Sequence, residues 1–204
     1  MNNNLQDSFW KSKFGNSYTK RNNKKKVIQS LTTHYKSVFK EKFKTDIRSV
    51  FEFGTNRGVN LDIFKKLSKR LDTNGLEINK FAYKIASKNH KILNISAFDY
   101  LPIKKYDLVL SRVFLIHIHP KNLNKIYSKI YKSSKKYIYL EEYFNPNPLG
   151  INYRKNKNVL FKRDFVKDLT KKYKLKVLSY GFNWKYDDKK PLLDDTTWFL
   201  LKKL

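Results

Sequence analysis

The residues Glu52-Phe-Gly54-Thr-Asn56-Arg-Gly58 lie where a short β-branched and aromatic run gives way to a helical pattern. Glycines at such a turn allow a tight bend and let a ligand approach the backbone. The loop differs from the GxGxxG of dinucleotide-binding proteins, because Asn56 takes the second glycine position and Glu52 lies two residues before Gly54. A carboxylate there disfavours a pyrophosphate and attracts a cation. The loop predicts a site for a small cationic ligand; the alternative is a turn that binds nothing.

Two further positions extend this predicted site. Glu77, followed by Ile78, ends the next strand pattern roughly twenty residues beyond Gly58, the spacing at which an acid binds ribose hydroxyls. Its carboxylate can accept both hydrogen bonds of a vicinal diol. Phe98 and Asp99 follow a third strand pattern, where an aromatic ring can stack on adenine and an acid can accept from the adenine amino group. The alternatives are a solvated Glu77 and a core Phe98.

Polar residues follow two more strand patterns, at the edge of a parallel sheet where ligands bind. They are Ser111, Arg112, His117 and His119 after the first pattern, and Glu141, Glu142, Tyr143 and Asn145 after the second. We expect Ser111 to contact the cationic ligand of the glycine loop, which would act as a cofactor. We expect Arg112 and Asn145 to contact a second ligand, the substrate.

Among these residues His117 is the first candidate for a general base, and Glu142 and Tyr143 are the next. An equally good interpretation makes His117 a hydrogen-bonded core histidine. His119 directly precedes Pro120, so we expect it to have a structural role at the start of a helix.

The segment FWKSKFGNSYTKRN (9–22) is too aromatic for a plain leader. It is predicted to fold over the site as a lid, with Tyr18 or Arg21 contacting a carboxylate or the substrate. The alternative is that its aromatic residues pack on the edge of the sheet.

Strand and helix patterns alternate along the chain. The spacing predicts helices over 24–44, 60–71, 80–90, 122–134 and 163–173, and strands over 49–54, 73–79, 90–96, 106–114, 135–143, 174–184 and 196–204. This order predicts an α/β fold with a mostly parallel sheet and helices on both faces. No helix separates the last two strands, so they must pair antiparallel. We expect an N-terminal lid and helix (1–45) packed on one core domain (46–204).

Composition limits the class of protein. The 204 residues carry a net charge of +28, spread along the whole chain, and contain no Cys. The spread favours compositional drift over a dedicated nucleic-acid site, which usually concentrates charge on one element. The absence of Cys excludes disulfides and thiolate metal sites. Because no apolar run suits a signal peptide or a membrane span, we expect a soluble protein. The lack of Cys suits a reducing cytoplasm, and we expect no metal ion.

The glycine loop, Glu77 and Asp99 together resemble the class I methyltransferase superfamily. More closely, the chain is similar to the family of methylases associated with pseudaminic acid biosynthesis, found beside bacterial surface-sugar genes. The matching stretches are 9–22, EFGTNRGVNL (52–61), GLEIN (75–79), YDLVLSRVFLIHIHP (106–120), EEYFNPNP (141–148), LFKRDF (160–165) and DDTTWFLLKK (194–203). The resemblance implies a Rossmann-like class I methyltransferase fold and S-adenosylmethionine as the methyl donor. It implies less about the acceptor, because the family is named by gene neighbourhood.

Three functions compete. The first is methylation of a small molecule, a sugar or a nucleotide-linked sugar. The second is methylation of nucleic acid or protein, suggested by the charge; however, the strand over 106–114 ends in SRVF and lacks the Asn-Pro-Pro-aromatic pattern of amino-methylating nucleic-acid enzymes. The third is a nicotinamide enzyme or a non-catalytic cofactor-binding homologue.

Overall fold

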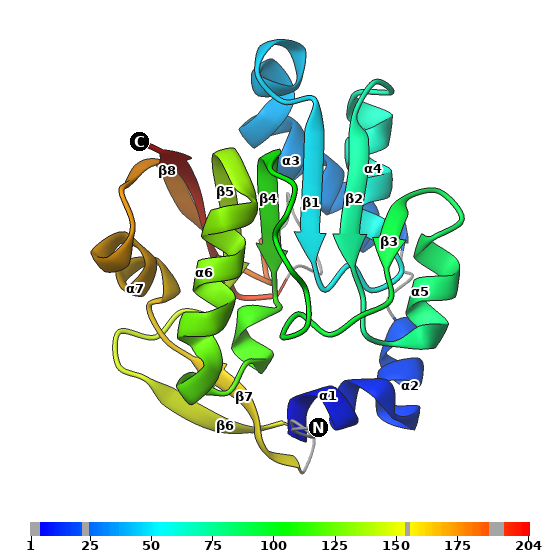
Figure 1. Cartoon of the computed structure of the whole chain (residues 1–204), viewed down its shortest axis with the longest axis vertical. Coiled ribbons are helices and arrows are strands. Elements are labelled where there is room, and N and C mark those ends of the chain that lie inside the picture. The colour runs from blue at the N-terminus through cyan, green and yellow to red at the C-terminus, as the bar shows by residue number, and fades with distance from the viewer. Residues whose placement is uncertain (1–4, 22–24, 154–155, 188–193) are drawn as a thin grey trace.

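The computed structural model describes residues 5–21, 25–153, 156–187 and 194–204. Within these residues, seven strands form one twisted sheet in the order β3-β2-β1-β4-β5-β9-β8 (Figure 1). In that order the strands are β3 (Lys91–Leu93), β2 (Asp72–Leu76), β1 (Ser49–Phe53), β4 (Tyr106–Arg112), β5 (Ser134–Glu142), β9 (Thr196–Lys203) and β8 (Leu175–Asn183). All seven were predicted from the sequence.

The first five strands of this order pair parallel, and β9 pairs antiparallel with both β5 and β8. The prediction of a mostly parallel sheet that ends in antiparallel strands is confirmed. Helices join β1 to β2, β2 to β3 and β4 to β5, since a parallel connection must cross over the sheet, whereas a loop joins β3 to β4. The helices that the sequence predicts are α3 (Lys25–Thr45), α4 (Val59–Leu67), α5 (Lys80–Ala86), α6 (Leu123–Ser133) and α7 (Phe165–Lys172).

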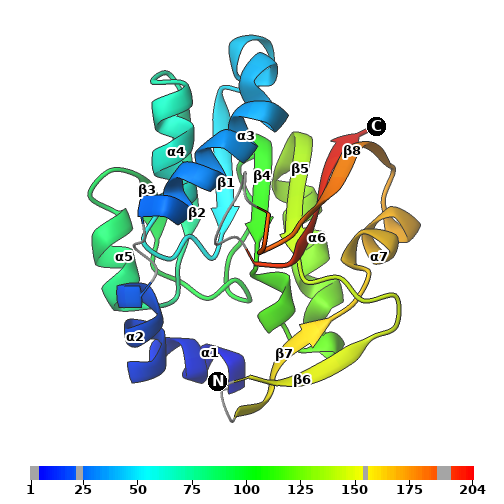
Figure 2. The same ribbon diagram turned by 180° about the vertical axis from the view of Figure 1, so that it is seen from behind.

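Helices cover both faces of the sheet, with α3 and α4 on one face and α6 and α7 on the other (Figures 1 and 2). Side chains alternate between the faces along each strand. In β1, Val50 packs in the core cluster of α3 and α4, whereas Phe51 packs in the cluster of α6 and α7. The same alternation holds for Leu108 and Val109 of β4. This alternation decides on which face each polar strand-end residue lies.

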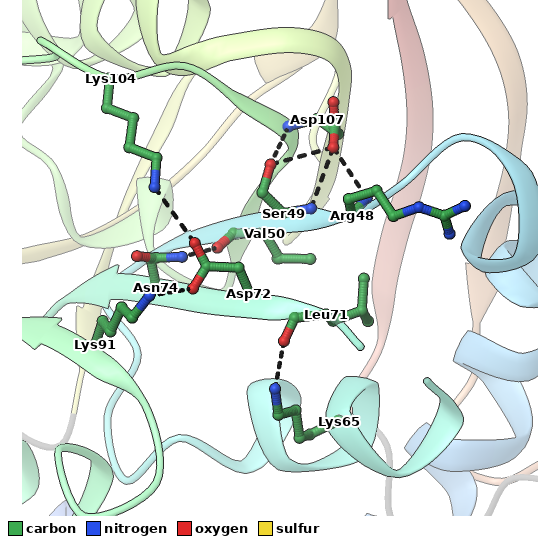
Figure 3. A network of polar contacts seen from close by, with 10 residues as sticks. All are labelled: Arg48, Ser49, Val50, Lys65, Leu71, Asp72, Asn74, Lys91, Lys104 and Asp107. Atoms are coloured by element: carbon green, nitrogen blue, oxygen red, sulfur yellow. Dashed lines mark hydrogen bonds and ion pairs between the residues drawn. The ribbon is translucent and has the colours of Figure 1, made fainter. Parts of the chain in front are cut away.

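Acidic residues at the amino ends of the strands have structural roles (Figure 3). Asp107 Oδ2 accepts hydrogen bonds from the backbone N–H groups of Arg48 (2.9 Å) and Ser49 (3.1 Å), and so joins the starts of β1 and β4. Asp72 forms ion pairs with Lys91 (2.8 Å) and Lys104 (3.3 Å). The carboxyl ends of the strands, opposite this edge, remain for ligands.

Elements that the periodicity analysis did not predict gather at the carboxyl edge. The helices α1 (Leu5–Lys11) and α2 (Lys13–Arg21) lie within the segment predicted as a lid, and β6 (Leu149–Tyr153) pairs with β7 (Asn156–Lys162) in a separate hairpin. The arrowheads of β1 and β2 point toward α1 and α2, and the hairpin lies beside α1 at the same end (Figures 1 and 2). Two short 3₁₀ helices, η1 (Leu115–His117) and η2 (Pro120–Asn122), follow β4.

None of the helices formed by the described residues is long and apolar enough to span a membrane.

Candidate functional site

A cavity of about 690 Å³ lies at the carboxyl edge of the sheet. Its size is within the range of small-molecule sites, about 300–1,000 Å³. The walls come from α1 and α2, the start of α3, the loops that follow β1, β2 and β3, and the segment that follows β4. Thus most of the elements that the sequence linked to ligand binding meet at one place, although no described residue of the segment directly after β5 lines the cavity.

The glycine loop forms one wall through Gly54 and Asn56, while Gly58 lies behind it at the start of α4. Gly54 has φ +71° and Gly58 has φ +83°, a left-handed conformation that L side chains rarely adopt. A Cβ atom on Gly54 would come within 2.6 Å of the Phe114 ring. Asn56 also has a positive φ of +47°. The loop therefore presents backbone directly to the cavity.

Glu77 lies across this loop, 7% exposed, and Ile78 beside it also lines the cavity. The Glu77 carboxylate accepts the backbone N–H groups of Asn56 (2.7 Å to Oε2) and Asn79 (2.7 Å to Oε1). Burial raises the pKa of Glu77 to about 6, although these N–H groups act to lower it. Each carboxylate oxygen has a second lone-pair site, so two further hydroxyl donors can still bind. The geometry fits the predicted ribose contact.

Glu52 is 1% exposed and lies on the α3 and α4 face, next to the cavity wall. Its Oε1 accepts a 2.6 Å hydrogen bond from Asn60, which lines the cavity. Its Oε2 is buried and has no hydrogen-bond partner among the residues described. Burial raises the pKa of Glu52 to about 8. A cation bound nearby would stabilise the ionised form of this carboxyl group.

Arg112 lines the cavity and belongs to a buried network of hydrogen bonds that is centred on Glu141. Its Nε donates to Glu141 Oε1 (3.0 Å). Glu141 also accepts from Tyr139 (2.9 Å) and Thr196 (3.0 Å). Although burial acts to raise the pKa of Glu141, Arg112 and then His34 hold it below its usual value. Arg112 is therefore a fixed cation, suited to a carboxylate or a phosphate.

His117 lies in η1 and lines the cavity. Its Nδ1 is 2.9 Å from the Val159 carbonyl oxygen in the hairpin. A carbonyl can only accept, so Nδ1 carries the proton and Nε2 presents a lone pair. Burial lowers the pKa of His117 to about 4, so the ring is neutral at pH 7. The histidine thus has both a core hydrogen bond and a second nitrogen for a ligand.

The other base candidates lie outside the cavity wall that the described residues form. Glu142, on the α6 and α7 face, accepts from the Ser111 hydroxyl (2.8 Å) and from three backbone N–H groups at the N-cap and start of η1 (3.0–3.3 Å). The prediction of Glu142 as a base is thus replaced by a positioning role, since these donors occupy its carboxylate. Ser111, fully buried, belongs to the same arrangement instead of the cofactor wall. Tyr143 packs against the core and under Lys162.

Two more predicted site residues lie outside the cavity wall formed by the described residues. Asp99 is exposed to solvent, whereas its neighbour Phe98 lines the cavity as expected. Asn145 donates to the carbonyl of Asn147 within its own loop. His119 caps η2 by accepting from the Lys121 N–H, in agreement with its predicted structural role.

The lid contributes more than the predicted Tyr18 and Arg21, both of which line the cavity. Trp10 lies with its ring centroid 4.6 Å from that of His117 and 5.2 Å from that of Tyr18. Its indole Nε1 is buried and has no partner within the described ranges. Asp7 lines the same cavity. The aromatic content of 9–22 signalled a lid, but no local pattern singled out Asp7, which precedes that segment.

No protein-family model matches the sequence, and no curated protein has significant sequence similarity to it. Solved structures are nevertheless similar along almost the whole chain. Magnesium protoporphyrin IX methyltransferase from Synechocystis PCC 6803 with bound S-adenosylhomocysteine has a TM-score of 0.71 at 10% identity, covering 98% of each chain. The fold is that of class I methyltransferases.

Two other similar structures have the same fold. One is 1,6-didemethyltoxoflavin-N1-methyltransferase from Burkholderia thailandensis, with a TM-score of 0.71, 10% identity, and 98% and 87% of the two chains covered. The other is an O-methyltransferase of a polyketide synthase from Brevibacillus brevis, with a TM-score of 0.66, 15% identity, and 100% and 81% covered. Both were crystallised with S-adenosylhomocysteine. At this level of identity the likeness establishes the fold.

Proposed function

We propose that this protein is an S-adenosylmethionine-dependent methyltransferase that acts on a small molecule, a sugar or a nucleotide-linked sugar. The observation that carries the proposal is the cavity itself. One part of its wall has the glycine loop, Glu77 and Phe98, and another has lid residues and His117. A methyltransferase needs this pairing of a donor site with an acceptor site in one enclosed space.

We place the donor against the first part of the wall. Ribose hydroxyls would bind Glu77, and adenine would lie between Ile78 and Phe98. The methionine end would lie near Glu52 and Arg112, whose charges match its ammonium and carboxylate groups. The unpartnered Oε2 of Glu52 and the cation at Arg112 both support this orientation. By contrast, the Glu52 carboxylate opposes a pyrophosphate, which argues against a nicotinamide cofactor.

The acceptor would occupy the space lined by Trp10, Tyr18, Arg21 and His117. Aromatic faces suit the apolar C–H surface of a sugar ring, and the polar tips of Tyr18 and Trp10 can bind its hydroxyls. Arg21 supplies a charge for an acidic or phosphorylated group. The proposed resemblance to methylases of surface-sugar pathways leads to the same acceptor class.

The bound donor supplies an electrophilic methyl group on a sulfonium, and the protein positions the acceptor atom in line with it. His117 would accept a hydrogen bond at Nε2 from the acceptor hydroxyl or amine, because its Nδ1–H is held by Val159. A base with a pKa of about 4 is weak, so its main contribution is to orient the nucleophile and to receive its proton late in the transfer. The lid would exclude water from the reacting atoms.

Titration calorimetry tests the donor, with S-adenosylhomocysteine, S-adenosylmethionine and NAD as separate ligands. We expect binding of the first two and none of NAD; tight NAD binding without binding of the methyl donor would contradict the proposal. A second assay follows transfer from methyl-labelled donor to a panel of free and nucleotide-linked sugars, with RNA and protein as comparison substrates. Transfer restricted to RNA or protein would contradict the proposed acceptor class.

A further inference from the structure

The adenine end of the proposed donor site lacks the acid that the sequence assigned to it. Asp99 is exposed, whereas Phe98 and Ala97 line the cavity. The loop that follows β3 therefore contributes an aromatic ring to this end of the cavity, but it does not direct its own carboxylate there.

Asp7 of α1 supplies a carboxylate at that place. It is half-buried, lines the cavity, and forms a hydrogen bond with the hydroxyl of Ser96 in the loop that follows β3. Burial raises the pKa of Asp7, and repulsion from Asp99 acts in the same direction, so the two carboxylates are close enough to influence each other. Of the two, Asp7 is the one that lines the cavity.

The position of α1 is fixed by specific contacts. The Asn79 side-chain amide donates to the Trp10 carbonyl and to Asn16 Oδ1, each at 2.9 Å. A Cβ atom on Gly15 would lie 2.0 Å from the Trp10 carbonyl oxygen and 2.8 Å from Asn79 Nδ2, so only glycine fits where α1, α2 and Asn79 meet. Asn79 lies two residues after Glu77 and accepts the Ala82 N–H at the start of α5. The lid is thus attached to the same loop that carries the predicted ribose acid.

An ionised carboxylate can accept hydrogen bonds but cannot donate them. A purine edge beside Asp7 must therefore present a donor. The exocyclic amino group of adenine does so, whereas the 6-oxo group of hypoxanthine presents an acceptor and would leave both groups unsatisfied. A site that is built around one hydrogen bond rejects an analogue that cannot make it.

We propose that Asp7 of the N-terminal lid, and not Asp99, recognises the amino group of the adenine of the bound cofactor. The inference rests on the proposed function, since it assumes that the cavity binds an adenosyl cofactor.

The experiment compares S-adenosylhomocysteine with S-inosylhomocysteine, which replaces the amino group by an oxo group. Calorimetry on the full chain is performed with wild type, Asp7→Asn, Asp7→Ala and the control Asp99→Asn. We expect the wild type to prefer the adenine ligand by about tenfold or more, the value of one hydrogen bond to a charged group. Asp7→Asn should lose most of this preference, because an amide can donate to the oxo group. Asp7→Ala should lower the affinity for S-adenosylhomocysteine without raising the affinity for S-inosylhomocysteine.

Asp99→Asn should keep both affinities within about twofold, because its side chain lies in solvent. Circular dichroism melting establishes that the Asp7 variants remain folded. If both Asp7 variants bind the adenine ligand as tightly and as selectively as wild type, or if Asp99→Asn loses the preference, the inference is wrong while the proposed function stands. If the wild type binds neither ligand, the proposed function itself is contradicted, and the inference falls with it.

Discussion

Binding of the methyl donor should release a proton from Glu52. The pKa of this buried carboxyl group is about 8, so at pH 7 only about 9% is ionised in the free protein. A ligand ammonium about 4 Å from the unpartnered Oε2 would interact with the carboxylate by about 4 kcal/mol at an effective dielectric constant of 20. That energy is worth about three pKa units, which brings the bound-state pKa to about 5.

These values predict the release of about 0.9 proton per ligand at pH 7. They also predict a rise in affinity of about 20-fold between pH 6 and pH 7.5, because the ionised form that the ligand prefers becomes more populated. The sign is fixed by the direction of the shift: burial raises the pKa in the free protein, and the ligand lowers it. Glu77, with a pKa of about 6, adds a smaller release near pH 6.

Calorimetry of S-adenosylhomocysteine at pH 7 in buffers of different ionisation enthalpy measures the released proton directly. Glu52→Gln is the matched control, since an amide keeps the Oε1 acceptor for Asn60 but cannot titrate. The difference between wild type and this variant isolates Glu52 from Glu77. Identical apparent enthalpies in all buffers, or the same pH profile in both proteins, would refute the reasoning that places the ligand ammonium beside Glu52.

Three further predictions concern other parts of the molecule. His117→Ala should lower turnover with an accepted sugar, while the Kd of the donor changes by less than about twofold. In the wild type, the loss of activity at acid pH should have its midpoint near pH 4 instead of 6.5, because burial lowers the pKa of His117. If His117→Ala instead melts early and no longer binds the donor, His117 is a core residue. Glu142→Ala should cost about 3–5 kcal/mol of unfolding free energy, by urea denaturation, because it leaves buried N–H groups unpaired. Glu142→Gln should cost only about 1 kcal/mol, because three of the four donors use Oε1; equal losses would contradict the positioning role. Fluorescence anisotropy with RNA should show sequence-independent binding that weakens by about 10³ or more between 50 and 200 mM salt, and selective nanomolar binding at physiological salt would favour a nucleic-acid substrate.

The main sheet could be predicted because each of its strands carries a local signal. Apolar runs such as YDLVLSR mark strands buried on both faces, and the lack of a helix between β8 and β9 determines that they pair antiparallel. The hairpin of β6 and β7 carries no such signal. β6 (LGINY) is short and contains a glycine, and β7 (NKNVLFK) has an apolar run of only three residues. The two strands pair with each other away from the main sheet.

The candidate site was predictable where its residues follow strands, as for Gly54, Glu77 and Phe98. Glu142 shows what a single sequence leaves open. Whether Glu141 or Glu142 faces the Arg112 side depends on the pleat of β5, which assigns the two residues to opposite faces of the sheet. Asp7 shows a second limit, because its partners lie about ninety residues away along the chain and only the folded lid brings them together.

Residues of both lid helices line the parts of the cavity proposed for the donor and for the acceptor, and this would have a kinetic consequence. Under the proposed function, spent donor and methylated product would leave past these helices, so each catalytic cycle would include an opening of α1 and α2. That opening would break the two Asn79 hydrogen bonds to the lid and separate the Trp10 and His117 rings. Lid motions of this kind take microseconds to milliseconds and often limit enzymes whose chemical step is fast. The residence time of the products, set by Asn79 and Trp10, would then determine the maximal rate of the enzyme.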